Sequence, residues 1–324
     1  MDGMRQFFII VFGGLAAIGA GIGIAYAGSY VWQTIKPDLA RLHMPQFSAV
    51  TSAMTPTDGT SISGASRTIR YTASEEEDLI NAAAQALPPG ADKRITAKAY
   101  IVKNLTLNEV VVEHDVDRAM PIASVSKLVT AVVARRLISA DERVTITRDI
   151  MATYGNTALF KVGETLKASD LLYPLRMVSS NDAAEAFAQD YGRAAFLRAM
   201  NEWVQSIGAY HTYFADPSGL SPKNVSTVHD LALIVNWIRK NDPTILETSL
   251  LKTKTVRVHT WINPTHFLSW SYYAGGKNGY TSEANHTSVA LFTLGKNKNV
   301  YAIIILNSSS RDADVLKLLE KVRE

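Results

Sequence analysis

The sequence contains no cysteine among its 324 residues. The chain therefore cannot form disulfides, use a thiol nucleophile or bind a metal through thiolates. Its seven histidines form no HExxH motif or comparable ligand spacing, so we predict neither a metal site nor a cofactor. An excess of one charge is also lacking, because 33 basic and 30 acidic side chains leave a formal net charge of +3. That balance, without a basic run interleaved with aromatic residues, argues against nucleic acid as a partner.

The N-terminal segment lacks charge over a long stretch. Residues 7–27 carry no charged side chain, and as a helix they would span about 31 Å, close to a bilayer core of about 30 Å. Ala25-Tyr26-Ala27 also has the small-x-small form of a signal-peptide cleavage site. We interpret residues 1–6 as a short cytoplasmic N-terminus and 7–27 as a single-pass membrane anchor, with a cleaved signal as the alternative. Under either interpretation the rest of the chain lies outside the cytoplasm, and cleavage would release it as a secreted protein.

A spacer separates this segment from the globular part. The stretch from His43 to Thr72 is rich in Ser, Thr, Pro and Gly and has few large apolar residues, which is typical of a flexible linker. Ser74-x-x-Glu77 has the pattern of a capping box that opens a helix. We therefore predict a spacer over residues 28–73 and one globular domain over residues 74–324.

The globular part has strand patterns at both ends and helix patterns between them. Strand-like runs occur near both ends, at 97–103, 110–114, 276–281, 287–294 and 300–306. A strong helix pattern covers about 124–139, a largely helical stretch continues to about Gly208, and another helix covers about 228–240. The chain closes with an amphipathic helix. This order predicts an α+β fold: one antiparallel sheet built from both ends of the domain and flanked by helices, with a helical subdomain inserted at about 141–215.

The first candidate for chemistry is a serine placed where the strong helix begins. Ser124 and Lys127 form an SxxK motif, and three-residue spacing puts both side chains on one helix face. A serine hydroxyl needs a neighbouring base, and a buried lysine can serve as that base. The motif is weak alone, because Ser249-Leu250-Leu251-Lys252 repeats it.

Two further motifs follow in a fixed order. Ser179-Ser180-Asn181 forms an SxN, and Lys277-Asn278-Gly279 forms a KxG on a predicted strand. No SxN follows Ser249, and the other KxG, Lys161-Val162-Gly163, precedes the SxN. With these three elements, from about residue 97 to 309, the chain resembles the D-alanyl-D-alanine carboxypeptidase family of low-molecular-mass penicillin-binding proteins. Residues 214–220 and 226–232 also resemble family segments, which we place outside the active site.

The resemblance implies a serine β-lactamase-like fold and a role for each motif residue. It implies that Ser124 is acylated by a peptidoglycan stem peptide, that Lys127 is its base, and that Ser179 passes a proton to the leaving amine. Asn181 would orient Lys127 and the substrate, and Lys277 would face the substrate carboxylate. The remaining substrate-binding positions are Asn278, Gly279 and Tyr280, the last contributing a backbone N–H to the oxyanion hole together with that of Ser124. β-Lactam antibiotics would be covalent inhibitors of such a site.

One position departs from the family pattern. The usual third motif is Lys-Thr-Gly, whereas this chain has Asn278. A planar amide cannot reproduce the position of a threonine hydroxyl, so the sequence predicts a weakened contact with the carboxylate. The predicted function is therefore a serine-type D-alanyl-D-alanine carboxypeptidase, with two alternatives: an endopeptidase that cuts peptidoglycan crosslinks, and a non-catalytic wall-binding protein. A β-lactamase is disfavoured, because no glutamate that could activate the deacylating water occurs between Gln205 and Thr244.

Overall fold

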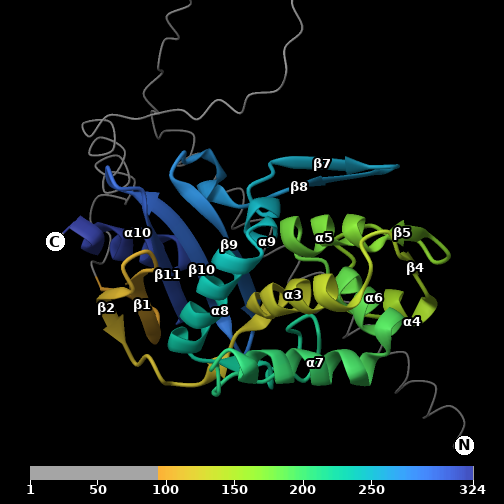
Figure 1. Ribbon diagram of the computed structural model, residues 1–324, viewed down its shortest axis with the longest axis horizontal. Coiled ribbons are helices and arrows are strands. Elements are labelled where there is room, and N and C mark those ends of the chain that lie inside the picture. The colour runs from red at the N-terminus through yellow and green to blue at the C-terminus, as the bar shows by residue number, and fades with distance from the viewer. Residues whose placement is uncertain (1–93, 324) are drawn as a thin grey trace, which may run out of the picture. The chain divides into compact units, whose positions relative to one another are not determined.

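The computed structural model describes residues 94–323 (Figure 1). The predictions for the N-terminal segment, the spacer and the capping box at Ser74 concern residues outside that range. Within the described residues, no helix is both long and apolar enough to cross a bilayer.

A five-stranded antiparallel sheet, in the order β2-β1-β11-β10-β9, combines strands from both ends of the described chain (Figure 1). Its strands are β1 (Ala99–Asn104), β2 (Glu109–His114), β9 (Tyr273–Thr281), β10 (Asn285–Leu294) and β11 (Asn299–Ser308). Asn108, with φ 61°, lies in the turn between the first two strands, where the left-handed region suits asparagine. The predicted α+β fold with a sheet built from both ends is confirmed.

Alternation along β11 divides the apolar core in two. Ala302, Ile304 and Leu306 belong to the larger cluster of buried residues, whereas Ile303 and Ile305 belong to the smaller one. Successive strand residues point to opposite faces, so each face of the sheet is buried. Helix α8 (Val228–Asn241) packs with the larger cluster, and α10 (Arg311–Glu320) packs with the smaller one.

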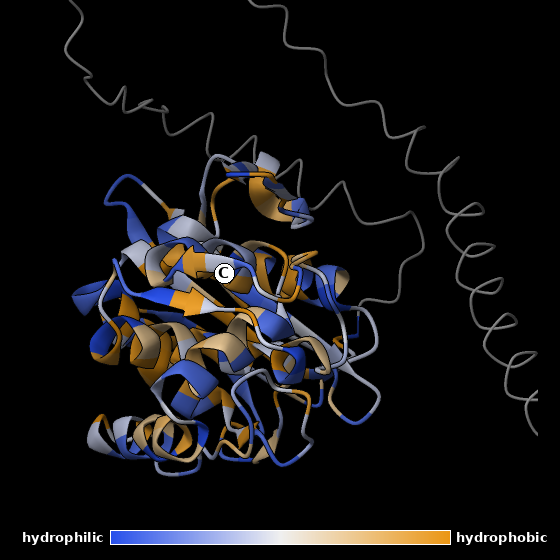
Figure 2. Cartoon of the chain, turned by 90° about the vertical axis from the view of Figure 1, so that its right-hand side faces the viewer, coloured by the Kyte–Doolittle hydropathy of each residue, from blue (hydrophilic) through white to orange (hydrophobic). Residues whose placement is uncertain are grey.

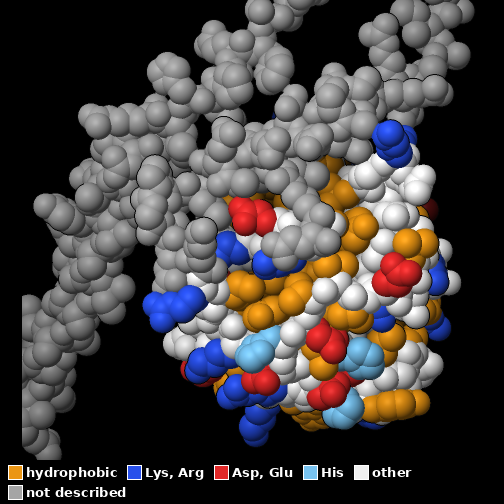
Figure 3. All heavy atoms as spheres, turned by 90° about the vertical axis from the view of Figure 1, so that its left-hand side faces the viewer, with side chains coloured by type: hydrophobic (Ala, Val, Ile, Leu, Met, Phe, Trp, Pro, Cys, Tyr) orange, Lys and Arg blue, Asp and Glu red, His pale blue; other side chains and the backbone are white. Residues whose placement is uncertain are grey.

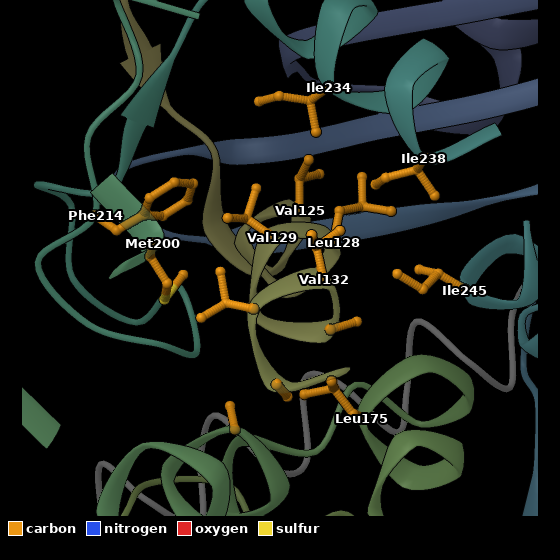
Figure 4. Packing of buried hydrophobic residues seen from close by; sticks show 14 of the residues in the cluster. Val125, Leu128, Val129, Val132, Leu175, Met200, Phe214, Ile234, Ile238 and Ile245 are labelled. Atoms are coloured by element: carbon orange, nitrogen blue, oxygen red, sulfur yellow. The ribbon is translucent and has the colours of Figure 1, made fainter. Parts of the chain in front are cut away.

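Helix α3 (Lys127–Leu137) lies at the centre of the larger cluster. It continues the short 3₁₀ helix η1 (Ala123–Ser126), so the SxxK motif spans the junction of the two. Leu128, Val129 and Val132 are almost fully buried, and Figure 4 shows them among side chains from several other helices. This packing on all sides holds the start of α3 in place.

The helices between α3 and α8 lie in the stretch that the sequence pattern predicts to be largely helical. They are α4 (Arg148–Met151), α5 (Ala168–Met177), α6 (Asn181–Tyr191) and α7 (Arg193–Ser206), followed after α8 by the short α9 (Thr244–Thr248). Figure 2 views the molecule from the side that carries these helices and shows apolar and hydrophilic residues alternating along them, as expected of helices with one buried face.

Short strand pairs escaped the sequence prediction. They are β3 (Met120–Pro121) with β6 (Val225–Ser226), β4 (Arg143–Thr145) with β5 (Thr165–Lys167), and β7 (Thr253–Val256) with β8 (His259–Ile262). No strand of these pairs exceeds four residues, which is too short to distinguish an alternating strand pattern from a loop.

On the side of the molecule that carries β1, β2 and α10, Figure 3 shows acidic and basic side chains interspersed over the visible surface.

The two ends of the described domain meet at Asp314 in α10. Its fully buried carboxylate accepts hydrogen bonds from the backbone N–H groups of Thr96 and Ala97 at 2.9–3.1 Å, and from the hydroxyls of Thr96 and Ser308 at 2.7 Å. A single side chain therefore fastens the residues before β1 to the end of β11.

Asp314→Ala is expected to destabilise the fold strongly, because it leaves several buried donors without an acceptor. At about 1–3 kcal/mol for each buried unsatisfied group, a loss of about 3 kcal/mol or more is expected, or about 6–12 °C in melting temperature for a domain of this size. The matched control is Asp141→Ala, which removes an exposed partner of Lys167 and should leave the melting curve nearly unchanged. Equal melting temperatures for the two variants would contradict this assignment.

Candidate active site

Ser124 lies on a tight turn that two glycines hold from two sides. The residue before it, Ala123, adopts φ 46°, a conformation that is strained for a residue with a Cβ atom. A Cβ atom on Gly219 would lie 2.0 Å from the Ala123 carbonyl oxygen, and one on Gly279 would lie 2.8 Å from the Ser124 nitrogen. The loop containing Gly219 and strand β9 therefore press on the turn closely enough that only glycine fits at either position.

Lys127 is the most constrained side chain of the site. It is fully buried, and its Nζ atom lies 2.9 Å from Ser124 Oγ, 2.7 Å from Asn181 Oδ1 and 2.6 Å from the Ser218 carbonyl oxygen. Three acceptors match the three N–H groups of an ammonium ion. A neutral amine would keep two of these bonds and direct its lone pair at the third partner.

The surroundings make that neutral form accessible near neutral pH. Burial lowers the pKa of Lys127 to about 7, and the nearby Arg176 guanidinium acts in the same direction. Two carboxylates oppose this shift: Asp216 acts more strongly than Arg176, and Asp182 acts less strongly than Arg176. A lysine with a pKa near 7 can accept a proton at physiological pH.

The SxN motif lies between α5 and the start of α6. Ser180 caps α6 by accepting the Ala183 N–H at 3.0 Å, which places Asn181 in the first turn facing Lys127. The Asn181 amide also donates to the Tyr154 carbonyl oxygen at 2.7 Å, so both ends of the amide are fixed. Ser179 lines the same cleft as Ser124. Its φ of 58° makes it, after Ala123, the second non-glycine residue of this site in the left-handed region.

The loop over residues 216–221 belongs to the site, so our placement of residues 214–220 outside it is wrong. The Asp216 carboxylate accepts the backbone N–H groups of Ser218, Gly219 and Ser221 at 2.7 Å each. The loop so formed presents the Ser218 carbonyl to Lys127. Sequence reasoning missed it because a backbone carbonyl has no side-chain signature; the pattern Asp-Pro-Ser-Gly was the only available signal.

Strand β9 brings the third motif to the opposite wall. Lys277 is almost fully buried, and its Nζ atom donates to the Asn278 carbonyl oxygen. Burial holds the pKa of Lys277 well below its usual value, and the cations Lys127, Arg176 and Arg311 add to the effect. Tyr280 is largely exposed at the rim, with its ring 4.7 Å from that of His286.

All three motifs converge on one cleft of about 460 Å³. The motif residues that line it are Ser124, Ser179, Asn181, Lys277, Asn278, Gly279 and Tyr280, while Lys127 lies buried behind Ser124. Arg176 and Arg311 also contribute to the lining, and among the described residues no Asp or Glu does. Nor do the described residues include a group of three potential metal ligands.

Arg176 is a site residue that the sequence did not reveal. It is almost fully buried, and it donates to the carbonyl oxygens of Ile245 at 3.2 Å and Gly276 at 2.8 Å. The second contact fixes β9 next to Lys277. An isolated arginine in a helix pattern carries no signal of such a role. The other SxxK serine, Ser249, is likewise structural, because its hydroxyl donates to the Leu246 carbonyl and accepts the Gly276 N–H.

Comparison with known proteins agrees with this geometry. The sequence profile of the D-alanyl-D-alanine carboxypeptidase family matches residues 82–309. A D-alanyl-D-alanine endopeptidase of Escherichia coli is 31% identical over 238 residues, covering 68% of this chain and 74% of that protein. A D-alanyl-D-alanine carboxypeptidase of Mycobacterium tuberculosis is 30% identical, covering 64% of this chain and 74% of its own length.

Solved structures show the same fold. Penicillin-binding protein D2 of Listeria monocytogenes, determined in its cefotaxime-bound form, superposes with a TM-score of 0.65 at 27% identity, covering 71% of this chain and 98% of that one. A D-alanyl-D-alanine carboxypeptidase of M. tuberculosis gives the same TM-score at 25% identity, with 72% and 94% covered. With the matching profile, these likenesses establish that the chain belongs to the D-alanyl-D-alanine carboxypeptidase family.

Proposed function

We propose that the protein is a serine-type D-alanyl-D-alanine carboxypeptidase that acts on peptidoglycan stem peptides through an acyl-enzyme on Ser124. The observation that carries this proposal is the contact between the buried Lys127 amine and the Ser124 hydroxyl at 2.9 Å. A serine hydroxyl becomes a competent nucleophile only beside a base that can take its proton. A lysine with a pKa of about 7 is such a base.

Lys127 acts in its neutral form. Two N–H groups remain bonded to Asn181 Oδ1 and the Ser218 carbonyl, so the lone pair is directed at the Ser124 hydroxyl. As Ser124 Oγ attacks the carbonyl carbon of the penultimate D-Ala, the hydroxyl proton moves to Lys127. The carbonyl oxygen becomes an oxyanion and is held by the backbone N–H groups of Ser124 and Tyr280.

Collapse of this intermediate breaks the peptide C–N bond. Ser179 lies on the same cleft and passes the proton from Lys127 to the leaving nitrogen, so D-alanine departs as a neutral amine and Ser124 carries an ester. Water then adds to the ester carbon while Lys127 takes one of its protons. Collapse of this second intermediate breaks the bond to Ser124 Oγ, and Lys127 returns the proton to that oxygen. The products are the shortened stem peptide and free Ser124.

The cationic end of the cleft suits a substrate with a free carboxylate. Lys277 and Arg176 are both buried, and neither pairs with an acidic side chain among the described residues. Burying a cation without a counter-charge is unfavourable. A substrate carboxylate beside Lys277 would stabilise the ammonium form of this lysine, which burial otherwise disfavours, and this favours cleavage next to a free D-Ala terminus.

An endopeptidase that cuts peptidoglycan crosslinks is the second candidate. It is supported by the relatives named D-alanyl-D-alanine endopeptidase at 29–31% identity. Both reactions use the same nucleophile and base and differ in what the leaving amine carries. A β-lactamase finds no such support, because the described cleft-lining residues include no glutamate to activate water.

We also propose that residues 7–27 hold the protein in the cell membrane, with the catalytic domain outside the cytoplasm. The support is the length of the uncharged run and the location of peptidoglycan beyond the membrane.

The function is tested on purified muropeptides. Wild-type protein is expected to remove the terminal D-Ala from monomeric pentapeptides, and mass analysis before and after incubation measures this loss. Release of monomers from crosslinked dimers, with pentapeptides untouched, would instead identify an endopeptidase.

The matched control is Ser124→Ala, which should be inactive on either substrate with an unchanged melting curve. Penicillin should label the wild-type protein stably, and digestion should locate the adduct on Ser124. An adduct on Ser249, or a protein that is never labelled, would refute the assignment of Ser124.

The rate of penicillin acylation is expected to depend on pH through Lys127. Because the neutral amine is the active form and its pKa is about 7, the rate should fall about tenfold per pH unit below that value and level off above it. Lys127→Ala should reduce acylation at least about 100-fold. Lys252→Ala, in the second SxxK sequence, is the control and should acylate normally. A pH-independent rate between pH 5 and 8 is incompatible with Lys127 as the base.

The mature protein is expected to keep its N-terminus and to stay with the membrane fraction. N-terminal sequencing of the protein from cells measures this directly, and protease added to intact spheroplasts should digest the catalytic domain. A mature sequence that begins at Gly28 would show that the segment is a cleaved signal.

A further inference from the structure

The position that departs from the family motif has a partner on the neighbouring strand. Asn278 of β9 and Ser288 of β10 face each other in the antiparallel register, so their side chains lie on one face of the sheet. The Ser288 hydroxyl donates to Asn278 Oδ1 at 2.8 Å. Asn278 lines the cleft, whereas Ser288 is fully buried behind it.

This contact fixes which end of the Asn278 amide faces the cleft. A buried hydroxyl proton needs an acceptor, and Asn278 Oδ1 is the acceptor that Ser288 has among the described residues. Turning the amide over would replace that oxygen with a second donor and leave the serine proton unpaired. The Nδ2 group, which has no hydrogen-bond partner within residues 94–323, is therefore the end left for a ligand.

We propose that Asn278 and Ser288 form a coupled carboxylate-binding pair, in which Ser288 is a positioning residue that holds the Asn278 amide with Nδ2 toward the substrate's terminal carboxylate. The inference rests on the proposed carboxypeptidase function. An N–H donor to a carboxylate forms a charge-assisted hydrogen bond. Lys277, which faces the carboxylate in the proposed function, immediately precedes Asn278 in the chain. The pair would do what the family's threonine hydroxyl does alone, with the amide oxygen bonded to Ser288 and the amide nitrogen left for the substrate.

This interpretation reverses what the sequence alone predicts for residue 278. A threonine hydroxyl oxygen lies one bond closer to the backbone than Asn278 Oδ1, so it cannot take the place of that oxygen as the acceptor for Ser288. Asn278→Thr is therefore expected to lower kcat/KM on a peptide ending in D-Ala-D-Ala, because it removes the Nδ2 donor and leaves the Ser288 hydroxyl without its acceptor.

The test compares two substrates that differ only at the carboxylate. An N-acetylated peptide ending in D-Ala-D-Ala is assayed beside the same peptide ending in D-alaninamide. For the full-length protein, Ser288→Ala is expected to lower kcat/KM about 3- to 10-fold on the acid and to have a clearly smaller effect on the amide, whose oxygen accepts a hydrogen bond without charge assistance. In an Asn278→Ala background, Ser288→Ala should have no further effect, because Ser288 acts through Asn278.

Two further variants complete the design. Thr293→Ala, on the same strand and away from the cleft, is the control and should match wild type on both substrates. Ser288→Cys keeps the side-chain shape and a weak donor, so it carries the test if Ser288→Ala is unstable, and its loss should be smaller.

The inference is overturned if Ser288→Ala has no effect, if it affects both substrates equally, or if its effect persists without Asn278. Those outcomes leave the proposed function intact as long as wild-type protein is acylated on Ser124. A wild-type protein that penicillin does not acylate would overturn the proposed function instead.

Discussion

The burial of one amine is the constraint on which the site depends. Lys127 is fully excluded from solvent, and a buried ammonium or amine is tolerated only when its hydrogen-bonding groups are satisfied. Its acceptors come from Ser124 three residues before it, from Asn181 54 residues after it and from Ser218 91 residues after it. The nucleophile, the helical region and the following loop must therefore be assembled together before Lys127 can be buried.

Burial and, after it, the neighbouring charges set the pKa of Lys127. Burial and the Arg176 guanidinium disfavour the ammonium form, while the buried carboxylates of Asp216 and Asp182 favour it. Burial also raises the pKa of Asp182 to about 6, so this carboxylate loses its charge already in mildly acidic solution, where an ordinary aspartate would keep it. Above that range the opposing influences leave the lysine with a pKa of about 7, where it can exchange a proton with the serine.

The sequence anticipates the side chains of the site better than the backbone around them. Ordered motifs indicated Ser124, Lys127, Asn181 and Lys277, and strand patterns at both ends of the domain predicted the sheet that brings Lys277 opposite Ser124. The carbonyl of Ser218 could not be predicted, because every residue has a carbonyl and only the folded loop aims this one at Lys127. Arg176, Ser249 and Ser288 were missed for a related reason: each acts through hydrogen bonds to segments distant in the sequence or on an adjacent strand.

Those missed residues share one physical task, which is to fix the backbone of β9 and the side chains it presents. Arg176 holds the Gly276 carbonyl and Ser249 holds the Gly276 N–H, immediately before Lys277. On the other side of that lysine, Gly279 lies against the turn of Ser124 with no room for a Cβ atom. Because a strand clamped at both sides of a residue cannot shift along its neighbour without losing these contacts, the distance between the cationic end of the cleft and the nucleophile is set. The contacts of Gly276 and Gly279 therefore position the third motif, whereas the burial of Lys127 sets the basicity of the amine beside Ser124.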